Sequence, residues 1–180
     1  MFQLDVVEKC KANDRKSQLK LYRQYCDGMF IVAMRFLGST DDAEDVLQDS
    51  FINAFQKIHQ YSGEVTFGAW LKRIVVNKCI DFLKSKKQDL VPLEEGYMQP
   101  VVDEDWSIGE EINIEEVKQV IQNLPEKYKY VVLMYLVEGF DHHEISQVLD
   151  ITETTSRTRL LRGKAYLKSV LIKKGYGTGS

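Results

Sequence analysis

The sequence predicts an all-α protein made of two small helical domains joined by an acidic linker. Apolar residues recur at helical spacing along most of the 180-residue chain, and no stretch alternates apolar and polar side chains between turn signals as a strand would. Only 3 prolines and 11 glycines are present, which argues against a loop-rich β architecture. Acidic residues gather in one short segment without apolar periodicity, and this segment divides the chain in two.

The first predicted domain, residues 1–90, is a helical bundle. A short helix is expected over Leu4–Lys11 and a longer one over Leu19–Leu37. A third helix follows, for which Thr40 is the expected N-cap. Its apolar stripe consists of Leu47, Phe51, Ala54, Phe55 and Ile58.

A polar loop and a fourth helix complete this domain. The loop, His59–Thr66, contains a glycine among polar residues. The fourth helix starts at Phe67 and runs to about Lys86, because Phe67, Leu71, Ile74 and Val75 recur at the spacing of one helical face.

The predicted linker, residues 91–111, lies in a strongly acidic part of the chain. Residues 1–90 carry 14 Lys/Arg against 12 Asp/Glu, a net charge of +2, and residues 117–180 carry 10 against 6, a net charge of +4. The intervening residues 91–116 hold 9 Asp/Glu and no Lys/Arg. The overall charge of −3 therefore conceals two mildly basic domains, which are compatible with binding to nucleic acid. The acidic segment is either a solvated spacer or a functional arm.

The second predicted domain, residues 112–180, contains four helices. The first spans Ile112–Asn123, and the second spans Glu126–Glu138 between Pro125 and Gly139. Asp141 is placed to cap a short helix that ends at Leu149, and Thr152 to cap a long basic helix that reaches about Lys173. A short helix, a three-residue turn and a longer basic helix form a helix-turn-helix arrangement.

The last helix has an apolar side and a DNA-compatible side. Ser156, Leu160, Gly163 and Leu167 are predicted to point inward. Hydroxyl and guanidinium groups fall on the outward side, where they suit phosphate and guanine contacts in a major groove. These outward residues are Thr155, Arg157, Thr158, Arg159 and Arg162.

No catalytic, metal or cofactor site is predicted. The three cysteines are widely spaced without a CxxC or His/Cys cluster, no Glu-x-x-His pair occurs, and no P-loop or GxSxG motif is present. The charged N-terminus does not resemble a signal peptide, and the most apolar stretch, Met29–Leu37, is too short to span a membrane. We expect a cytoplasmic protein that is not an enzyme and does not insert into a membrane.

Three segments of the chain resemble extracytoplasmic-function (ECF) sigma factors, the smallest class of promoter-specificity subunit of bacterial RNA polymerase. The first is Asp42–Asp49 (DAEDVLQD), followed by Phe51, Ala54 and Phe55. The second is Phe67–Asn77 (FGAWLKRIVVN) with Ile80–Leu83, and the third runs from Leu124 to Arg162. The similarity extends over roughly residues 15–170 in the order and spacing of the family.

In this family the first segment belongs to region 2, which docks on the clamp helices of the largest polymerase subunit. The resemblance implies that the residues turned away from the Phe51/Phe55 stripe make this contact. Without the resemblance, these residues would be interpreted as a solvated helix face. These residues are Asp41, Asp45, Gln48, Asp49 and Ile52. The flap of the second-largest subunit is a further implied contact.

The second segment resembles the part of region 2 that melts and reads the −10 element. By this resemblance the loop His59–Thr66 holds a flipped base of the single strand, and Asn77 contacts DNA at the melted edge. Phe67 and Trp70 could instead belong to the core. The implied DNA-binding residues are Tyr61, Ser62, Phe67, Trp70, Lys72, Arg73, Asn77 and Lys78.

The third segment resembles region 4, which reads the −35 element of duplex promoter DNA through the five outward residues of the last helix. Two residues depart from the family pattern. Asp150 stands where glycine commonly closes the turn, so it is expected in a left-handed conformation. Ser156 stands at an inward position that is usually aliphatic, so it either weakens the packing or needs a local backbone hydrogen bond. His142 and His143 are interpreted as surface or phosphate-facing residues with no metal role.

The resemblance also implies an anti-sigma factor as a partner, and places the acidic linker in a basic channel of the polymerase. The alternative is a helix-turn-helix regulator that never joins polymerase. That alternative would explain residues 117–180 but leaves the pattern from Asp42 to Asn77 without a role.

Overall fold

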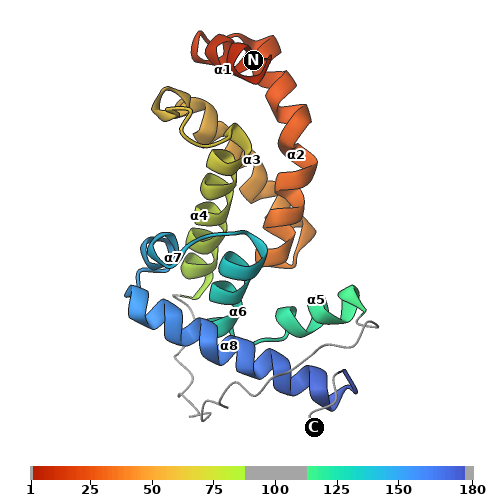
Figure 1. Ribbon diagram of the computed structural model, residues 1–180. Helices are drawn as coiled ribbons and strands as arrows, with labels where there is room; N and C mark the ends of the chain where they lie inside the picture. Colours follow the sequence, from red (N-terminus) through yellow and green to blue (C-terminus); the bar gives the residue numbers. More distant parts are fainter. Residues whose placement is uncertain (1, 88–112, 177–180) are drawn as a thin grey trace. The chain divides into compact units, whose positions relative to one another are not determined.

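The computed structural model describes residues 2–87 and 113–176, and every regular element in these ranges is helical (Figure 1). The chain forms two compact units, Met1–Val91 and Pro92–Ser180. The predicted linker, residues 91–111, lies outside the described residues.

Four helices and one short 3₁₀ turn build the first unit. They are α1 (Phe2–Lys11), α2 (Arg15–Leu37), α3 (Thr40–Gln56), η1 (Ile58–Gln60) and α4 (Phe67–Lys87). Helices α2, α3 and α4 pack against one another, and α1 packs on α2 and η1. Their shared core contains Leu21 and Phe36 of α2, Phe51 of α3, and Phe67 and Leu71 of α4, all at most 3% exposed.

Three helix starts in this unit differ from the sequence prediction, the first being that of α1, which begins at Phe2 rather than Leu4. Helix α2 begins at Arg15 rather than Leu19, because the Asp14 carboxylate accepts the backbone N–H of Ser17 and caps the helix four residues earlier. Helix α3 is capped by Ser39 and not by Thr40, since the Ser39 hydroxyl accepts the N–H of Asp42.

The second unit contains α5 (Ile114–Gln122), α6 (Glu126–Val132), α7 (His142–Leu149) and α8 (Glu153–Lys173). Helices α5, α6 and α7 each pack against α8. Asn113 caps α5, so that helix begins two residues after the predicted Ile112. Asp141 and Glu144 form a reciprocal capping box at the start of α7.

The sequence predicts that α6 continues as a regular α-helix to Glu138, but the structure differs. The helix passes into a π-helical turn, η2 (Leu133–Val137), before Gly139 ends it at φ +78°. Leu133 and Met134 are buried, whereas Tyr135, Leu136 and Val137 are 39–49% exposed. The wider turn thus presents three consecutive apolar side chains to solvent.

Candidate nucleic-acid interface

The turn between α7 and α8 has the predicted helix-turn-helix geometry. Asp150 adopts the left-handed conformation, φ +55° and ψ +52°, and its N–H reaches the carbonyl of Ser146. Thr152 then caps α8 by accepting the N–H of Thr155 at 3.0 Å. Three of the four residues predicted to point inward on α8, Ser156, Leu160 and Gly163, are buried, whereas the fourth, Leu167, is only half-buried.

Gly163 allows α6 and α8 to approach closely. A Cβ atom at this position would lie 2.6 Å from Cγ2 of Val132 and 3.3 Å from Cβ of Tyr128. Only hydrogen fits here, so the position of α8 against α6 depends on this glycine.

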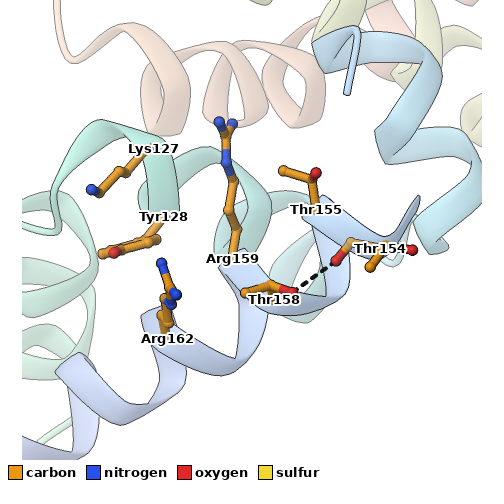
Figure 2. Close-up of a pocket in the computed structure, with 7 residues that line it drawn as sticks. All are labelled: Lys127, Tyr128, Thr154, Thr155, Thr158, Arg159 and Arg162. Carbon is orange, nitrogen blue, oxygen red and sulfur yellow. Dashed lines mark hydrogen bonds between the residues drawn. The ribbon is translucent and has the colours of Figure 1, made fainter. Parts of the chain in front are cut away.

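An open pocket of about 220 Å³ lies between α6 and α8 (Figure 2). Four of the five outward residues predicted on α8 line it. The sequence prediction missed the contribution of α6, which no local pattern signals. The complete lining is Lys127, Tyr128, Thr154, Thr155, Thr158, Arg159 and Arg162.

The pocket combines cations with hydroxyl groups. Figure 2 shows Arg159 and Arg162 rising from the same side of α8, with Tyr128 of α6 beside Arg162. The ammonium of Lys127 lies 5.1 Å from the centroid of the Tyr128 ring. The hydroxyl of Thr158 donates to the carbonyl of Thr154 at 3.0 Å. This set of donors is suited to anionic groups.

Arg157, the fifth predicted DNA residue, is not part of this pocket. Its Nη2 donates to Oε2 of Glu153 at 2.9 Å, and Nδ1 of His143 lies 3.2 Å from Oε1 of the same carboxylate. Both side chains of the Arg157–Glu153 ion pair are well exposed, so the pair contributes little stability. Arg157 can therefore leave Glu153 and bind another anion at little cost in free energy.

The structure corrects the interpretation of His142 as a surface residue. Its Nδ1 lies 2.9 Å from Oγ of Ser156, which is completely buried, and its ring stacks on Tyr135 with centroids 4.6 Å apart. Burial lowers the pKa of His142, and the positive charge of Arg157 adds to the effect. His142 therefore supplies the hydrogen bond that Ser156 needs, while His143 lies exposed as predicted.

In the first unit, the residues predicted to bind polymerase form one exposed face of α3. Asp41, Asp45, Gln48 and Asp49 are all exposed, and Ile52 keeps 57% of its surface in solvent. The opposite face of α3, including Leu47 and Phe51, is buried. An exposed isoleucine within an acidic face is the expected composition of a docking surface for a basic partner.

The loop after α3 is held by a cluster of aromatic rings. Tyr61, Phe67 and Trp70 lie with their ring centroids 5.5–5.7 Å apart, and Tyr25 of α2 adds a fourth ring. The hydroxyl of Tyr61 donates to the carbonyl of Val65 at 2.7 Å and closes the loop.

This burial limits which rings can meet a base. Phe67 is 2% exposed and belongs to the core, the alternative that the sequence left open, and Tyr61 is 8% exposed against the expectation of a free ring. Trp70 is only half-buried, and Ser62 is exposed. The exposed side of the cluster therefore consists of Trp70 and the loop tip.

Polar side chains extend this side along α4. Arg73 and Asn77 are exposed and one turn apart, and Nδ2 of Asn77 donates to the carbonyl of Arg73 at 2.7 Å. Lys72 and Lys78 are half-buried on the flanks of the same helix. The structure thus gathers Trp70, Asn77 and three cations on one helix.

Within the described ranges, no three His, Cys, Asp or Glu side chains lie close enough together to hold a metal ion. Among the helices in those ranges, none combines the length and apolar character that crossing a membrane requires.

Two family models match this chain. The model for Sigma-70 region 2 matches residues 21–88, and the model for Sigma-70 region 4 matches residues 114–167. The first match covers α2 to α4, and the second covers α5 to most of α8.

Two curated relatives named as ECF RNA polymerase sigma factors align with this chain over nearly their whole length. The chain is 30% identical over 177 residues to the ECF RNA polymerase sigma factor SigW of Bacillus subtilis, covering 92% of this chain and 94% of the relative. It is 27% identical over 178 residues to the ECF RNA polymerase sigma-E factor of Haemophilus influenzae, covering 91% and 92% respectively.

Two solved structures share the fold. CnrH, solved in complex with the cytosolic domain of CnrY, gives a TM-score of 0.58 at 18% identity and covers 95% of this chain and 97% of its own. The sigma factor RpoE of Bartonella quintana, solved with the anti-sigma factor NepR, gives 0.57 at 17% identity and covers 84% and 94%. With both family regions matched in order and a 30% identical relative aligned over 94% of its length, the chain belongs to the ECF family of RNA polymerase sigma factors.

Proposed function

We propose that this chain binds core RNA polymerase, directs it to specific promoters and promotes melting of the DNA at the start site. The observation that carries the proposal is the presence of two differently built exposed surfaces in one sigma-family chain. One is the acidic face of α3 with Ile52, and the other is the cationic, hydroxyl-rich face of α8. The protein positions polymerase and performs no bond chemistry itself.

Each unit has its own role in this proposal. The exposed face of α3 docks on the clamp helices of the largest subunit, where its charge sets orientation and association rate. Trp70, Asn77 and the neighbouring cations of α4 contact the separated strand of the −10 element, because stacking and backbone charge are what single-stranded DNA offers. Helix α8 reads the −35 duplex.

The chemistry of α8 favours a duplex as its target. Thr155, Thr158, Arg159 and Arg162 present hydroxyl and guanidinium groups along one side of α8, which packs against three other helices. Arg can bind guanine through two hydrogen bonds, and threonine hydroxyls suit phosphates and base edges.

An anti-sigma factor is the further partner that we propose. CnrH was solved with the cytosolic domain of CnrY, and the sigma factor RpoE with the anti-sigma factor NepR. We expect an anti-sigma factor to bind this chain and to compete with core polymerase. Co-expression followed by competitive pull-down against core polymerase tests this partner.

Reconstitution tests the main proposal. The purified chain is mixed with core polymerase, and transcripts made from a fragment library of the source genome are mapped. We expect a stable holoenzyme and a set of start sites that share −10 and −35 sequences. A chain that binds duplex DNA but never co-purifies with core polymerase is instead a helix-turn-helix regulator.

A further inference from the structure

Helix α1 precedes the residues that the Sigma-70 region 2 model matches, 21–88, yet it packs on two elements of the first unit. One is α2, and the other is η1, the short turn Ile58–Gln60. The turn η1 leads directly into residues 61–66, the loop that is the proposed receptor of a flipped base. Helix α1 therefore lies against the start of this loop without being part of it.

Apolar burial holds α1 in this position. Val6, Val7 and Cys10 lie on one face of the helix, and each is at most 6% exposed. Ile58, the first residue of η1, is 1% exposed. Glu8, beside Val7 in the sequence, lies in solvent on the other side of α1. The contact of α1 with the rest of the unit is therefore made by its apolar face.

The turn between α1 and α2 fixes the direction of α1. Asn13 adopts the left-handed conformation at φ +60°, and its N–H donates to the carbonyl of Cys10 at 2.9 Å. The N–H of Asp14 donates to the carbonyl of Lys9 at 3.1 Å, which completes a Schellman motif. Figure 1 shows α1 at the end of α2 where that helix begins. Helix α1 thus connects η1 to α2 as a fixed support.

The loop after η1 depends on its first residue for its position. Tyr61 is buried, its N–H donates to the carbonyl of Ile58 at 3.2 Å, and its hydroxyl closes the loop on Val65. Residues 62–66 are all exposed. Groups that bind a ligand must be held within about 0.5 Å of the productive geometry. The position of η1 therefore decides whether the loop is placed correctly for a base.

We infer that α1 is a positioning element for −10 recognition: its buried face, Val6, Val7 and Cys10, holds η1 and so fixes the loop in the geometry that accepts a base. This inference rests on the proposed function, because it concerns the same loop. Helix α1 makes no contact with DNA in this arrangement. It acts through η1 and Tyr61, so a defect in α1 should be felt only where the loop holds its base.

The test uses the reconstituted holoenzyme and a promoter fragment with a single-stranded −10 element, from which the bases are removed one at a time. For the wild type, loss of the captured base should weaken binding roughly tenfold, the order expected for one stacked base. Val7→Ala should weaken binding of the intact strand by a similar factor, because a cavity under α1 lets η1 shift. On the strand that lacks the captured base, Val7→Ala and wild type should bind equally, because both changes act through one contact.

Two control variants separate positioning from a general loss of stability. Val32→Ala makes the same truncation at a buried residue near the C-terminal end of α2, whereas α1 joins the N-terminal end. Its effect on binding should be the same with and without the captured base. Glu8→Ala changes an exposed residue of α1 and should leave both affinities at the wild-type values.

Amide hydrogen exchange in the free chain tests the support of the loop without DNA or polymerase. The amides of Gln60 and Tyr61 donate to the carbonyls of Lys57 and Ile58 at 2.8 and 3.2 Å. Both amides should exchange several times faster in Val7→Ala, because η1 opens more often when α1 packs less tightly. Val32→Ala should accelerate them less than Val7→Ala does.

An equal loss of affinity by Val7→Ala on intact and abasic strands overturns the inference, even if the holoenzyme opens promoters normally. Unchanged exchange at Gln60 and Tyr61 also overturns it. A wild-type holoenzyme that is indifferent to every missing base counts against the proposed −10 role of the loop. Exchange then decides alone whether α1 supports the loop, with faster exchange in Val7→Ala in favour and unchanged exchange against.

Discussion

Nδ1 of His142 and Oγ of Ser156 lie 2.9 Å apart and connect the two helices of the helix-turn-helix. Ser156 is completely buried on the inner side of α8, at a position where an aliphatic side chain would normally pack. His142, at the first position of α7, also stacks on Tyr135. The attachment of α8 to α7 is therefore partly polar, and its strength depends on the state of one imidazole.

The first prediction concerns the stability of α8. His142→Ala leaves the buried hydroxyl of Ser156 without this partner and should destabilise α7 and α8 by about 1–3 kcal/mol. Amide hydrogen exchange in the two helices measures the change. His143→Ala is the control, because the side chain of His143 is 65% exposed and its contact with Glu153 is worth less than about 1 kcal/mol. Equal effects of the two substitutions would contradict the proposed role of the hydrogen bond.

The second prediction is a pH dependence of the same helices. Burial lowers the pKa of His142 in the folded protein, with Arg157 adding to the shift and Glu153 and Asp141 opposing it. The unfolded chain, with a pKa near 6.5, therefore binds a proton more readily than the folded chain. Stability contributed by neutral His142 is complete above pH 6.5 and is lost as the pH falls through the lower, folded pKa.

Ring signals of His142 in a pH titration give this folded pKa directly. His142→Gln, which cannot titrate, should remove this component of the pH dependence of α7 and α8 exchange. An unchanged acid profile in His142→Gln would show that another group is responsible.

The third prediction compares two glycines in helices. Gly163→Ala would force a Cβ against Val132 Cγ2, a side-chain atom that cannot swing away, and should cost about 1–3 kcal/mol. Gly28→Ala, in the middle of α2, meets no atom within 4 Å and should stabilise its helix by up to about 1 kcal/mol. Urea unfolding of the full chain, followed by signals from each unit, distinguishes the two. A stabilising Gly163→Ala would mean that α6 and α8 can separate easily.

The fourth prediction concerns polymerase binding by α3. Ile52 is 57% exposed in the free chain, and we expect it to be buried against core polymerase in the complex. Ile52→Ala should therefore weaken binding to core polymerase by roughly tenfold in Kd. Ile31→Ala on α2 is a matched control, because Ile31 is 52% exposed and lies outside the α3 face. Competition binding to core polymerase measures both variants. A similar loss for Ile31→Ala would place the contact elsewhere.

The fifth prediction assigns Asn77 to melting. The hydrogen bond from its Nδ2 to the Arg73 carbonyl orients the amide at the exposed side of α4. Asn77→Ala should lower open-complex formation roughly tenfold, the effect of one lost base contact, with little change in core binding. Permanganate footprinting reports the melted bases.

Gln48→Ala is the counterpart of this variant, since Gln48 belongs to the α3 face. It should reduce core binding and leave melting normal once the holoenzyme is saturated. Normal footprints with Asn77→Ala would exclude the assigned role.

Much of the helical architecture could be predicted because its signals are local. Gly139 at positive φ and the Thr152 cap each follow from residues within one turn of the chain, whereas the left-handed Asp150 is expected from the resemblance to the family. The start of α2 escaped prediction because Arg15–Gln18 has no apolar stripe, although Asp14 caps it. The π-helical turn Leu133–Val137 could not be predicted, because a uniformly apolar run is compatible with an α-helix and with a π-helix.

The candidate site was harder to predict where it depends on packing between helices. The outward residues of α8 followed from its periodicity, but Lys127 joins them only because Gly163 brings α6 close. Tyr61 is assigned to DNA by the family resemblance, and only tertiary contacts reveal that its ring is covered. For Phe67 the apolar stripe already offers the core as an alternative. For Ser156 the sequence predicts either weaker packing or a hydrogen bond to the local backbone, whereas its partner is the side chain of His142 on another helix.

The hydrogen bond from Tyr61 to Val65 has a consequence for the energetics of strand capture. A loop of this length would ordinarily lose about 1–2 kcal/mol of backbone entropy per residue on becoming ordered around a ligand. Here the buried tyrosine ring, its bond to Val65 and the left-handed Gly63 already hold the loop during folding. In the proposed function, a base that enters this loop meets a preformed receptor, and more of its stacking and hydrogen-bond energy remains available to separate the duplex.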